Sequence, residues 1–358
     1  MFAKKLIAAL AAASVAPAAL AMDTSGSAYG AFRLSLGYFD SGSGEDVRVD
    51  NNNSYIGLRA QTVEGDITAF ASYERFADND NTYLDGEFVR QFYGGLRHRD
   101  YGTLIFGRAP TAYKLSGQKL DPFYATAVSG LNGGTTALSI AGGAGYGMSA
   151  LTGDVSGSGF VSNQLAYTSP SYGGVTVNGA VFFDDGGGAS EEVDYGAGVE
   201  YSAGGLTAGV QLLDISTGSS PGSQPNFFTD GLTGASGKLT ALRGYGGYAD
   251  VNWGAGASYE LLDLGNDLPD RTYMFASAWY GLSQYLRVAA VVGRTEDTPY
   301  EGMSYTVGAS YEIVENLNTY VAARYVDRQL SEASSAQTDD TQTYALGVAY
   351  NFEIGFGN

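Results

Sequence analysis

The chain has 358 residues and a formal net charge of −19, and it contains 52 Gly, 27 Tyr, 17 Phe, 8 Pro and no Cys. The glycine and tyrosine content is typical of many short strands joined by tight turns, and the lack of cysteine excludes disulfides and thiolate metal sites. The acidic balance argues against nucleic acid as a partner, and beyond the N-terminus no apolar run is long enough for a membrane-spanning helix.

Residues 1–21 have the pattern of a signal peptide. A basic start with two lysines precedes an apolar stretch, and Ala19-Leu20-Ala21 is a small-x-small cleavage pattern. We therefore predict an exported protein whose mature part begins at Met22. Because the segment contains two bases and no acids, its removal would change the formal charge from −19 to −21.

Apolar and polar residues alternate with a period of two along the rest of the chain, which indicates half-buried strands. In 303–313, for example, Tyr305, Val307 and Ala309 alternate with small polar residues. Sixteen such runs are predicted as strands: 27–39, 53–62, 66–76, 87–98, 103–110, 163–171, 175–184, 193–201, 206–214, 238–250, 252–261, 271–280, 284–293, 303–313, 317–327 and 341–352.

The connections between these strands alternate between short turns and long loops, so one rim would carry the turns and the other the loops. A bacterial outer-membrane barrel with an even number of antiparallel strands has this asymmetry. One strand face is apolar, whereas the other carries small polar residues and arginines such as Arg287 and Arg324. Closure of the sheet would satisfy every backbone hydrogen bond within lipid. The sequence therefore predicts an all-β fold, a sixteen-stranded antiparallel transmembrane β-barrel over residues 22–358.

The third long connection, at about 111–162, differs from the others in length and composition. It is rich in Gly, Ala and Leu over 128–151, and its only acids are Asp121 and Asp154. Loops of this length without periodicity are uncommon unless they are functional. Sixteen strands enclose a lumen far wider than a selective pore needs. We predict that this loop 3 folds into the lumen and narrows it.

Two stretches resemble the general bacterial porins. Gly94-Gly-Leu-Arg97 followed by Tyr101-Gly-Thr-Leu-Ile-Phe-Gly-Arg108 is similar to the family's fourth-to-fifth strand signature. Asn163-Gln-Leu-Ala-Tyr-Thr-Ser-Pro170, with Tyr172-Gly-Gly174 after it, is similar to the sixth-strand motif. The resemblance implies a homotrimer of sixteen-stranded barrels in the bacterial outer membrane, surrounded by outer-membrane lipid and lipopolysaccharide, with the third loop inside each pore.

Two features depart from the family pattern. The family usually ends on an aromatic residue, whereas here Phe352 takes that place and residues 353–358 are expected to trail beyond it. Basic residues common on strands two and six are partly missing, with Tyr55 and Ser162 near those positions. The second departure bears on ion selectivity.

A pore constriction is predicted from six charged residues. The resemblance carries over Arg90, because Arg90-Gln-Phe-Tyr-Gly-Gly-Leu96 matches the fourth-strand pattern. Together with Arg90, three further arginines would form a basic wall facing Asp121 and Asp154 of the loop. The alternatives are that the arginines are ordinary solvated lumen residues and that the two aspartates shape turns. The three arginines predicted to form the basic wall together with Arg90 are Arg33, Arg59 and Arg108.

No other motif indicates a cofactor, a metal or catalysis. The acids of 78–87 do not form a calcium loop, because Tyr83 and Val89 stand where an EF-hand needs Gly and Glu. The glycines of 142–147 lack the strand–helix context of a nucleotide site. His98 is the only histidine and has no supporting nucleophile, so we do not expect an enzyme.

The predicted function is passive diffusion of ions and small hydrophilic solutes across the outer membrane. A substrate-specific channel is one alternative, because Tyr113, Phe123, Tyr124 and Tyr146 of the loop permit an aromatic path. An adhesin or phage-receptor barrel is another, in which the long loops matter more than the lumen.

Cation preference and a homotrimer complete the predictions. Most acids lie in or beside the long connections and would make the outer mouth negative, among them Glu45, Asp46, Asp184, Asp185, Glu191, Glu192, Asp339 and Asp340. The outward faces of the first and last strands are small or aliphatic, which suits contact between copies (Gly30, Leu34, Leu36, Leu346 and Val348).

Overall fold

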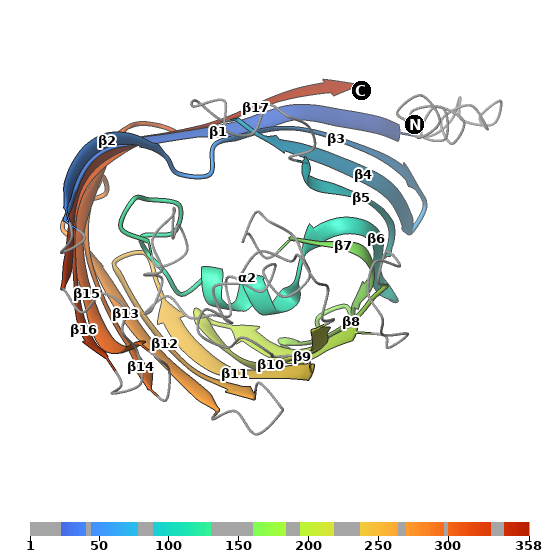
Figure 1. The fold of residues 1–358 in the computed structure, drawn as a ribbon. Coiled ribbons are helices and arrows are strands. Elements are labelled where there is room, and N and C mark those ends of the chain that lie inside the picture. The colour runs from blue at the N-terminus through green and yellow to red at the C-terminus, as the bar shows by residue number, and fades with distance from the viewer. Residues whose placement is uncertain are drawn as a thin grey trace, which may run out of the picture.

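The structure is a computed structural model and describes residues 23–40, 44–77, 89–129, 160–183, 194–217, 237–263, 270–296, 300–330 and 340–357. The strands form a ring around a central space, and one helix, α2 (Ala112–Gln118), lies inside the ring (Figure 1). The strands are β1 (Asp23–Asp40), β2 (Glu45–Asn51), β3 (Tyr55–Glu64), β4 (Ile67–Phe76), β5 (Val89–His98), β6 (Gly102–Pro110), β7 (Phe160–Thr168), β8 (Val175–Phe182), β9 (Asp194–Ala203), β10 (Leu206–Thr217), β11 (Gly237–Ala249), β12 (Trp253–Asp263), β13 (Arg271–Gly281), β14 (Leu286–Glu296), β15 (Tyr300–Val314), β16 (Leu317–Leu330) and β17 (Thr341–Gly357).

The ring is closed, because β1 pairs with β17 on one side and with β2 and β3 on the other. The two segments β2 and β3 are one barrel strand interrupted by an irregularity at 52–54. There the backbone N–H of Asn52 donates to the carbonyl oxygen of Arg33 at 2.8 Å, and the Arg33 N–H donates to Ser54 Oγ at 2.9 Å. Counted as one strand, they give the predicted sixteen-stranded antiparallel barrel.

Three boundaries differ from the prediction. Residues 45–51 were expected in a loop, but they form β2, so Glu45 and Asp46 lie in a strand. The expectation that residues 353–358 trail beyond the last strand is wrong, since β17 continues to Gly357 and its last part pairs with β1. The loop predicted between β14 and β15 is short, because β14 ends at Glu296 and β15 begins at Tyr300.

The short turns lie at one rim, as predicted, and one of the two-residue turns joins β9 to β10. Ala203 pairs directly with Leu206, so the turn consists of Gly204 and Gly205 alone. Both have positive φ, at 59° and 84°. Two such residues in succession are the signature of a type I′ hairpin turn, whose twist matches that of the flanking strands. Side chains other than glycine would be strained here.

Apolar side chains face outward and polar ones face the lumen. On β1, Phe32, Leu34 and Leu36 are exposed, whereas Ser27 and Ser35 on the other face are buried. In an antiparallel barrel within lipid this is the expected arrangement. Exposed aromatic residues lie near the strand ends, as in the interfacial girdles of outer-membrane barrels, including Tyr73, Tyr201, Trp253, Tyr280, Tyr285, Tyr311 and Tyr350. Trp279 alternates with outward Tyr280 and therefore faces the lumen.

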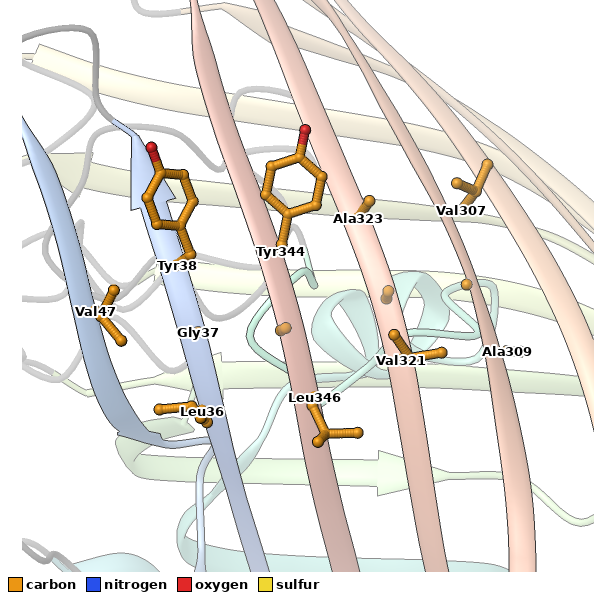
Figure 2. Close-up of a pocket in the computed structure, with 13 residues that line it drawn as sticks. Leu36, Gly37, Tyr38, Val47, Val307, Ala309, Val321, Ala323, Tyr344 and Leu346 are labelled. Carbon is orange, nitrogen blue, oxygen red and sulfur yellow. The ribbon is translucent and has the colours of Figure 1, made fainter.

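An apolar hollow of about 630 Å³ lies on the outward face, where the first and last strands meet (Figure 2). Its floor is formed by small residues such as Ala309 and Ala323, and its sides by Leu36, Val321 and Leu346. Figure 2 shows the hydroxyl groups of Tyr38 and Tyr344 at the same end of the hollow. The two rings pack 6.1 Å apart. This hollow is part of the lipid-facing side of the barrel and not of the lumen.

Candidate functional site

The first part of the third loop, residues 111–129, is described and is called the inward segment below. It leaves β6 at Pro110 and turns into α2, whose N-terminus is capped by Thr111. The Thr111 side-chain oxygen accepts a hydrogen bond from the Lys114 N–H at 3.1 Å. Such a cap satisfies one of the free N–H groups at the start of a helix. The strand therefore ends in a short helix that lies within the ring (Figure 1).

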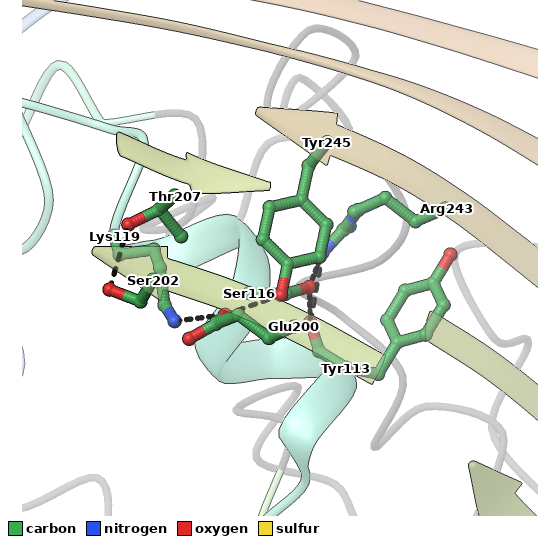
Figure 3. A network of polar contacts seen from close by, with 8 residues as sticks. All are labelled: Tyr113, Ser116, Lys119, Glu200, Ser202, Thr207, Arg243 and Tyr245. Atoms are coloured by element: carbon green, nitrogen blue, oxygen red, sulfur yellow. Dashed lines mark hydrogen bonds and ion pairs between the residues drawn. The ribbon is translucent and has the colours of Figure 1, made fainter. Parts of the chain in front are cut away.

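Arg243 of β11 anchors α2 to the barrel wall (Figure 3). Its Nη1 donates to the carbonyl oxygen of Tyr113 at 2.9 Å and to Ser116 Oγ at 3.2 Å. Its Nη2 lies 2.7 Å from Glu260 Oε2 on β12, and both charged side chains are 2% exposed. A buried ion pair with additional hydrogen bonds fixes geometry strongly, because a loss of either partner leaves the other charge buried and unpaired.

A second contact joins the end of α2 to β9 and β11 (Figure 3). Lys119 Nζ lies 2.5 Å from Glu200 Oε2, and the Tyr245 hydroxyl donates to the same oxygen. Glu200 faces the lumen because it alternates with outward Val199 and Tyr201. The loop cation is thus neutralised by a carboxylate of the wall.

The remainder of the inward segment follows the inner wall toward β16. Ser277 Oγ of β13 donates to the carbonyl oxygen of Leu120 at 2.6 Å, and the Ala127 N–H donates to the Tyr320 hydroxyl at 3.0 Å. Phe123 and Val128 form a buried cluster with Tyr320 and its neighbours. The segment is therefore held at several points between β9 and β17.

Asp121 is buried and forms a local turn. One of its carboxylate oxygens accepts from the Phe123 N–H at 2.8 Å, and the other accepts from Ser129 Oγ at 3.0 Å. Burial raises the pKa of this carboxyl group, and the two hydrogen bonds oppose that effect. Asp121 thus forms a turn within its own loop, and Arg324 of β16 is near enough to lower its pKa as well. Asp154 lies outside the described residues.

Three of the four predicted wall arginines face the lumen. Arg33 on β1, Arg59 on β3 and Arg90 on β5 are called the arginine wall below. Arg90 occurs where β5 shifts register against β4, so a bulge turns its side chain inward. It is buried, pairs with Glu74, and lies 4.2 Å from the Tyr55 ring centre. Arg59 pairs with Glu353 and donates from Nε to Ser27 Oγ at 2.8 Å.

Arg108 does not belong to this wall. In the ladder it stands opposite Phe92, whose ring is exposed on the outward face, and directly opposed residues share a face. Its guanidinium donates to the carbonyl oxygen of Val89 at 2.8 Å and to Ser162 Oγ at 3.1 Å. The prediction that placed Arg108 in the constriction is therefore wrong, because Arg108 shares the outward face of β6 with Leu104 and Phe106.

The inward segment approaches the arginine wall at two places. Tyr124 is close enough to Arg33 to interact with it electrostatically. Lys114 is buried, with its Nζ 4.8 Å from the Phe160 ring centre, and it faces Arg90. Burial, together with the nearby Arg90, lowers the pKa of Lys114 to about 7. The inward segment and the arginine wall therefore meet through an aromatic ring and a titratable amine, while Asp121 interacts electrostatically with Arg324 of β16.

Sequence reasoning missed the residues that anchor the loop. Arg243 and Glu260 each lie on an inward strand face, but nothing in a single sequence shows that they pair with each other and with α2. Glu74 was missed as the partner of Arg90 for the same reason. A signal did exist for Glu74, because it is an acid on the polar face of the strand next to Arg90. Among the described residues, no group of three His, Cys, Asp or Glu side chains is arranged to hold a metal.

Family comparison decides the identity of the barrel. The profile of the Gram-negative porins matches residues 7–355, which is nearly the whole chain. The chain belongs to the Gram-negative porin family. It is therefore an outer-membrane porin that forms a diffusion channel, and the expectation of a channel and not an enzyme is confirmed.

Solved structures share the fold of this porin at low identity. The anion-selective porin from Comamonas acidovorans superposes with a TM-score of 0.71 and 17% identity, over 92% of this chain and 100% of that one. OmpT of Vibrio cholerae in its trimer form superposes with a TM-score of 0.66 and 15% identity, over 92% of this chain and 100% of that one. Salmonella typhi OmpF in complex with daunomycin superposes with a TM-score of 0.61 and 16% identity, over 92% of this chain and 97% of that one. No curated protein matches the chain.

Proposed function

We propose that the third loop of this porin narrows the lumen and that solutes are selected between the inward segment and the arginine wall. The anchoring of α2 by Arg243 carries this proposal, because it holds the loop inside the ring at a fixed position. The approach of Tyr124 to Arg33 supports a narrow gap at that level. Selection by size then follows from the geometry of the gap, and selection by charge from its walls.

The same channel is proposed to prefer cations. The chain carries twice as many acids as bases, with 38 Asp and Glu against 19 Lys and Arg. Several inward cations are neutralised by wall carboxylates, since Arg90 pairs with Glu74, Arg243 with Glu260 and Lys119 with Glu200. These pairs leave a smaller positive field at the narrow part than the number of arginines suggests. The acids of the loop rim then dominate at low ionic strength.

The zero-current potential across a planar bilayer with a salt gradient tests this proposal. The purified protein is inserted at low and at high ionic strength. The proposal is supported if the sign of the zero-current potential indicates cation selectivity and its magnitude falls as salt is added. If the sign of the zero-current potential in dilute salt indicates anion selectivity, the arginine wall dominates. The absence of any ion current would exclude a channel altogether.

We also propose that the protein is a homotrimer and that the apolar hollow of Figure 2 lies at or beside the contact between copies. Its position at β1, β2 and β15–β17 coincides with the small and aliphatic outward residues of the first and last strands. The neighbour OmpT of Vibrio cholerae is described in a trimer form. Outer-membrane lipid and lipopolysaccharide would cover the rest of the outward face. Residues 1–21, which lie outside the described residues, are proposed to be removed as a signal peptide.

A further inference from the structure

Arginines stacked on aromatic rings line the lumen near the rim of short turns. On one wall, Arg97 of β5 lies over the ring of Phe70 on β4, with 5.4 Å between guanidinium carbon and ring centre. On another wall, Arg287 of β14 lies over Trp279 of β13 at 3.9 Å. Both arginines are exposed. Cation–π contact of this kind holds a guanidinium against the wall while it remains accessible.

Register places both pairs inside the barrel and at the same rim. Arg97 pairs with Thr103, the second residue after a short turn, and alternates with outward Leu96. Arg287 pairs with Gly281, the last residue of β13 before the short turn to β14. In outer-membrane barrels the short turns are periplasmic. The two pairs therefore flank the periplasmic mouth of the channel.

These two arginines differ from three other inward cations of the barrel. Arg90, Arg243 and Lys119 each have a carboxylate partner on the wall. Within the described ranges, neither Arg97 nor Arg287 forms an ion pair, so their N–H groups face the lumen without a protein carboxylate.

The wall beside Arg97 is shaped to hold a ring. A β-carbon at Gly95 would lie 2.7 Å from Cζ of Phe70, so only glycine lets this ring lie across the wall. Tyr93 packs edge-on against Phe70, with 6.3 Å between ring centres and 79° between planes. A third aromatic ring that enters from the lumen would meet the guanidinium face and the ring edges, which is a favourable arrangement for aromatic groups.

We propose that the Arg97–Phe70 and Arg287–Trp279 pairs bind aromatic carboxylates transiently as these pass the periplasmic mouth. The guanidinium fork matches a carboxylate in two parallel hydrogen bonds, and the aromatic ring of the solute contacts the stacked pair. This inference rests on the proposed channel function and names a class of solute for it. Aliphatic carboxylates of equal charge gain only the ionic contact and bind more weakly.

Block of single-channel current tests the proposal with the full protein in a planar bilayer. Benzoate, cyclohexanecarboxylate and acetate are added to the periplasmic side at constant ionic strength. We expect saturable block by benzoate at a clearly lower concentration than by cyclohexanecarboxylate, and the weakest block by acetate. The double variant R97Q/R287Q should raise the half-blocking concentration of benzoate about tenfold, in line with the loss of charge-assisted hydrogen bonds.

Two further variants separate the contribution of the aromatic ring to block from that of positive charge near the mouth. F70L keeps both charges and should reduce the difference between benzoate and cyclohexanecarboxylate. R99Q removes one charge from the exposed turn only two residues beyond Arg97, where it pairs with Asp66 and Asp100, and should leave the block unchanged. Equal block by the three carboxylates, or equal sensitivity in R97Q/R287Q and wild type, would overturn the inference while the basal current still showed a channel. A protein without basal current would instead refute the proposed function.

Discussion

Arg243 reaches across the inner wall to the carbonyl oxygen of Tyr113, 130 residues away in sequence and 2.9 Å away in space. The arginine is also paired with Glu260, and Tyr113 lies beneath its guanidinium at 4.4 Å from the ring centre. One side chain of the barrel therefore holds both the backbone and the ring of the first helical turn of the third loop.

Replacement of Arg243 should release α2 from the wall. R243M leaves Glu260 buried without its cation, and we expect a loss of about 3–5 kcal/mol of stability. The double variant R243M/E260M removes both charges and should recover most of that stability, yet it still lacks the bonds to Tyr113 and Ser116. Single-channel recordings of the double variant should show higher and noisier conductance than wild type. Thermal unfolding in detergent checks the first expectation, and quiet conductance at the wild-type level would contradict the second.

Glu74 should set the charge of the arginine wall. It accepts hydrogen bonds from Tyr29 and Gln91 and forms an ion pair with Arg90. In E74Q the hydrogen bonds can persist, whereas the positive charge of Arg90 is no longer balanced. We expect the zero-current potential to shift toward anions. E74Q/R90Q is neutral again and should return close to wild type, so identical potentials for the single and double variants would contradict this role.

Selectivity should depend on pH near neutrality through Lys114. Burial and the neighbouring Arg90 place the pKa of this amine at about 7, so it is neutral above that pH and charged below it. Cation preference should therefore be weaker at pH 6 than at pH 8.5, and K114M should lose the difference. The control is H98Q, which replaces the only histidine of the chain. H98Q should keep the dependence, and a dependence lost in H98Q but kept in K114M would assign the effect to the histidine.

The outward hollow should matter for assembly and not for the channel itself. A323W fills the floor of the hollow, whereas A208W adds the same ring to an outward position on β10, across the barrel. We expect chemical crosslinking in mild detergent to give trimers for wild type and A208W and a reduced trimer yield for A323W. A single monomer band for wild type at every crosslinker dose would refute the homotrimer.

The barrel was predictable because its driving pattern is local. Alternation with period two marks a strand that has lipid on one face and water on the other, and each run carries that signal by itself. The pattern was overlooked in β2, where Asp46, Arg48 and Asp50 resemble a solvated loop. They face inward, and Arg48 forms ion pairs with both aspartates, so a charged strand is stable there. In the tail, Phe352, Ile354 and Phe356 continue the alternation that the expectation of a terminal aromatic residue obscured.

The constriction was predictable only in part, because its charges are defined by distant partners. That Arg33 and Arg59 point into the lumen follows from the alternation of apolar and polar residues along their strands. Arg90 faces inward because of a bulge that leaves no mark in a single sequence, whereas Arg108 shares a face with outward Leu104 and Phe106, as alternation alone indicates. Asp121 illustrates the reverse case, since a residue that precedes proline often serves its own turn.

The ion pair between Arg59 and Glu353 joins residues 294 positions apart and crosses over β1, where Ser27 lies between them. Both ends of the polypeptide must be present before this bond can form, and the final residues of β17 supply the last rungs against Ser25–Tyr29. Contacts between such distant positions form late, since the long intervening chain must first be ordered. A polypeptide that ends before Glu353 therefore leaves the edge of β1 unpaired at Ser25–Tyr29 and Arg59 without its carboxylate.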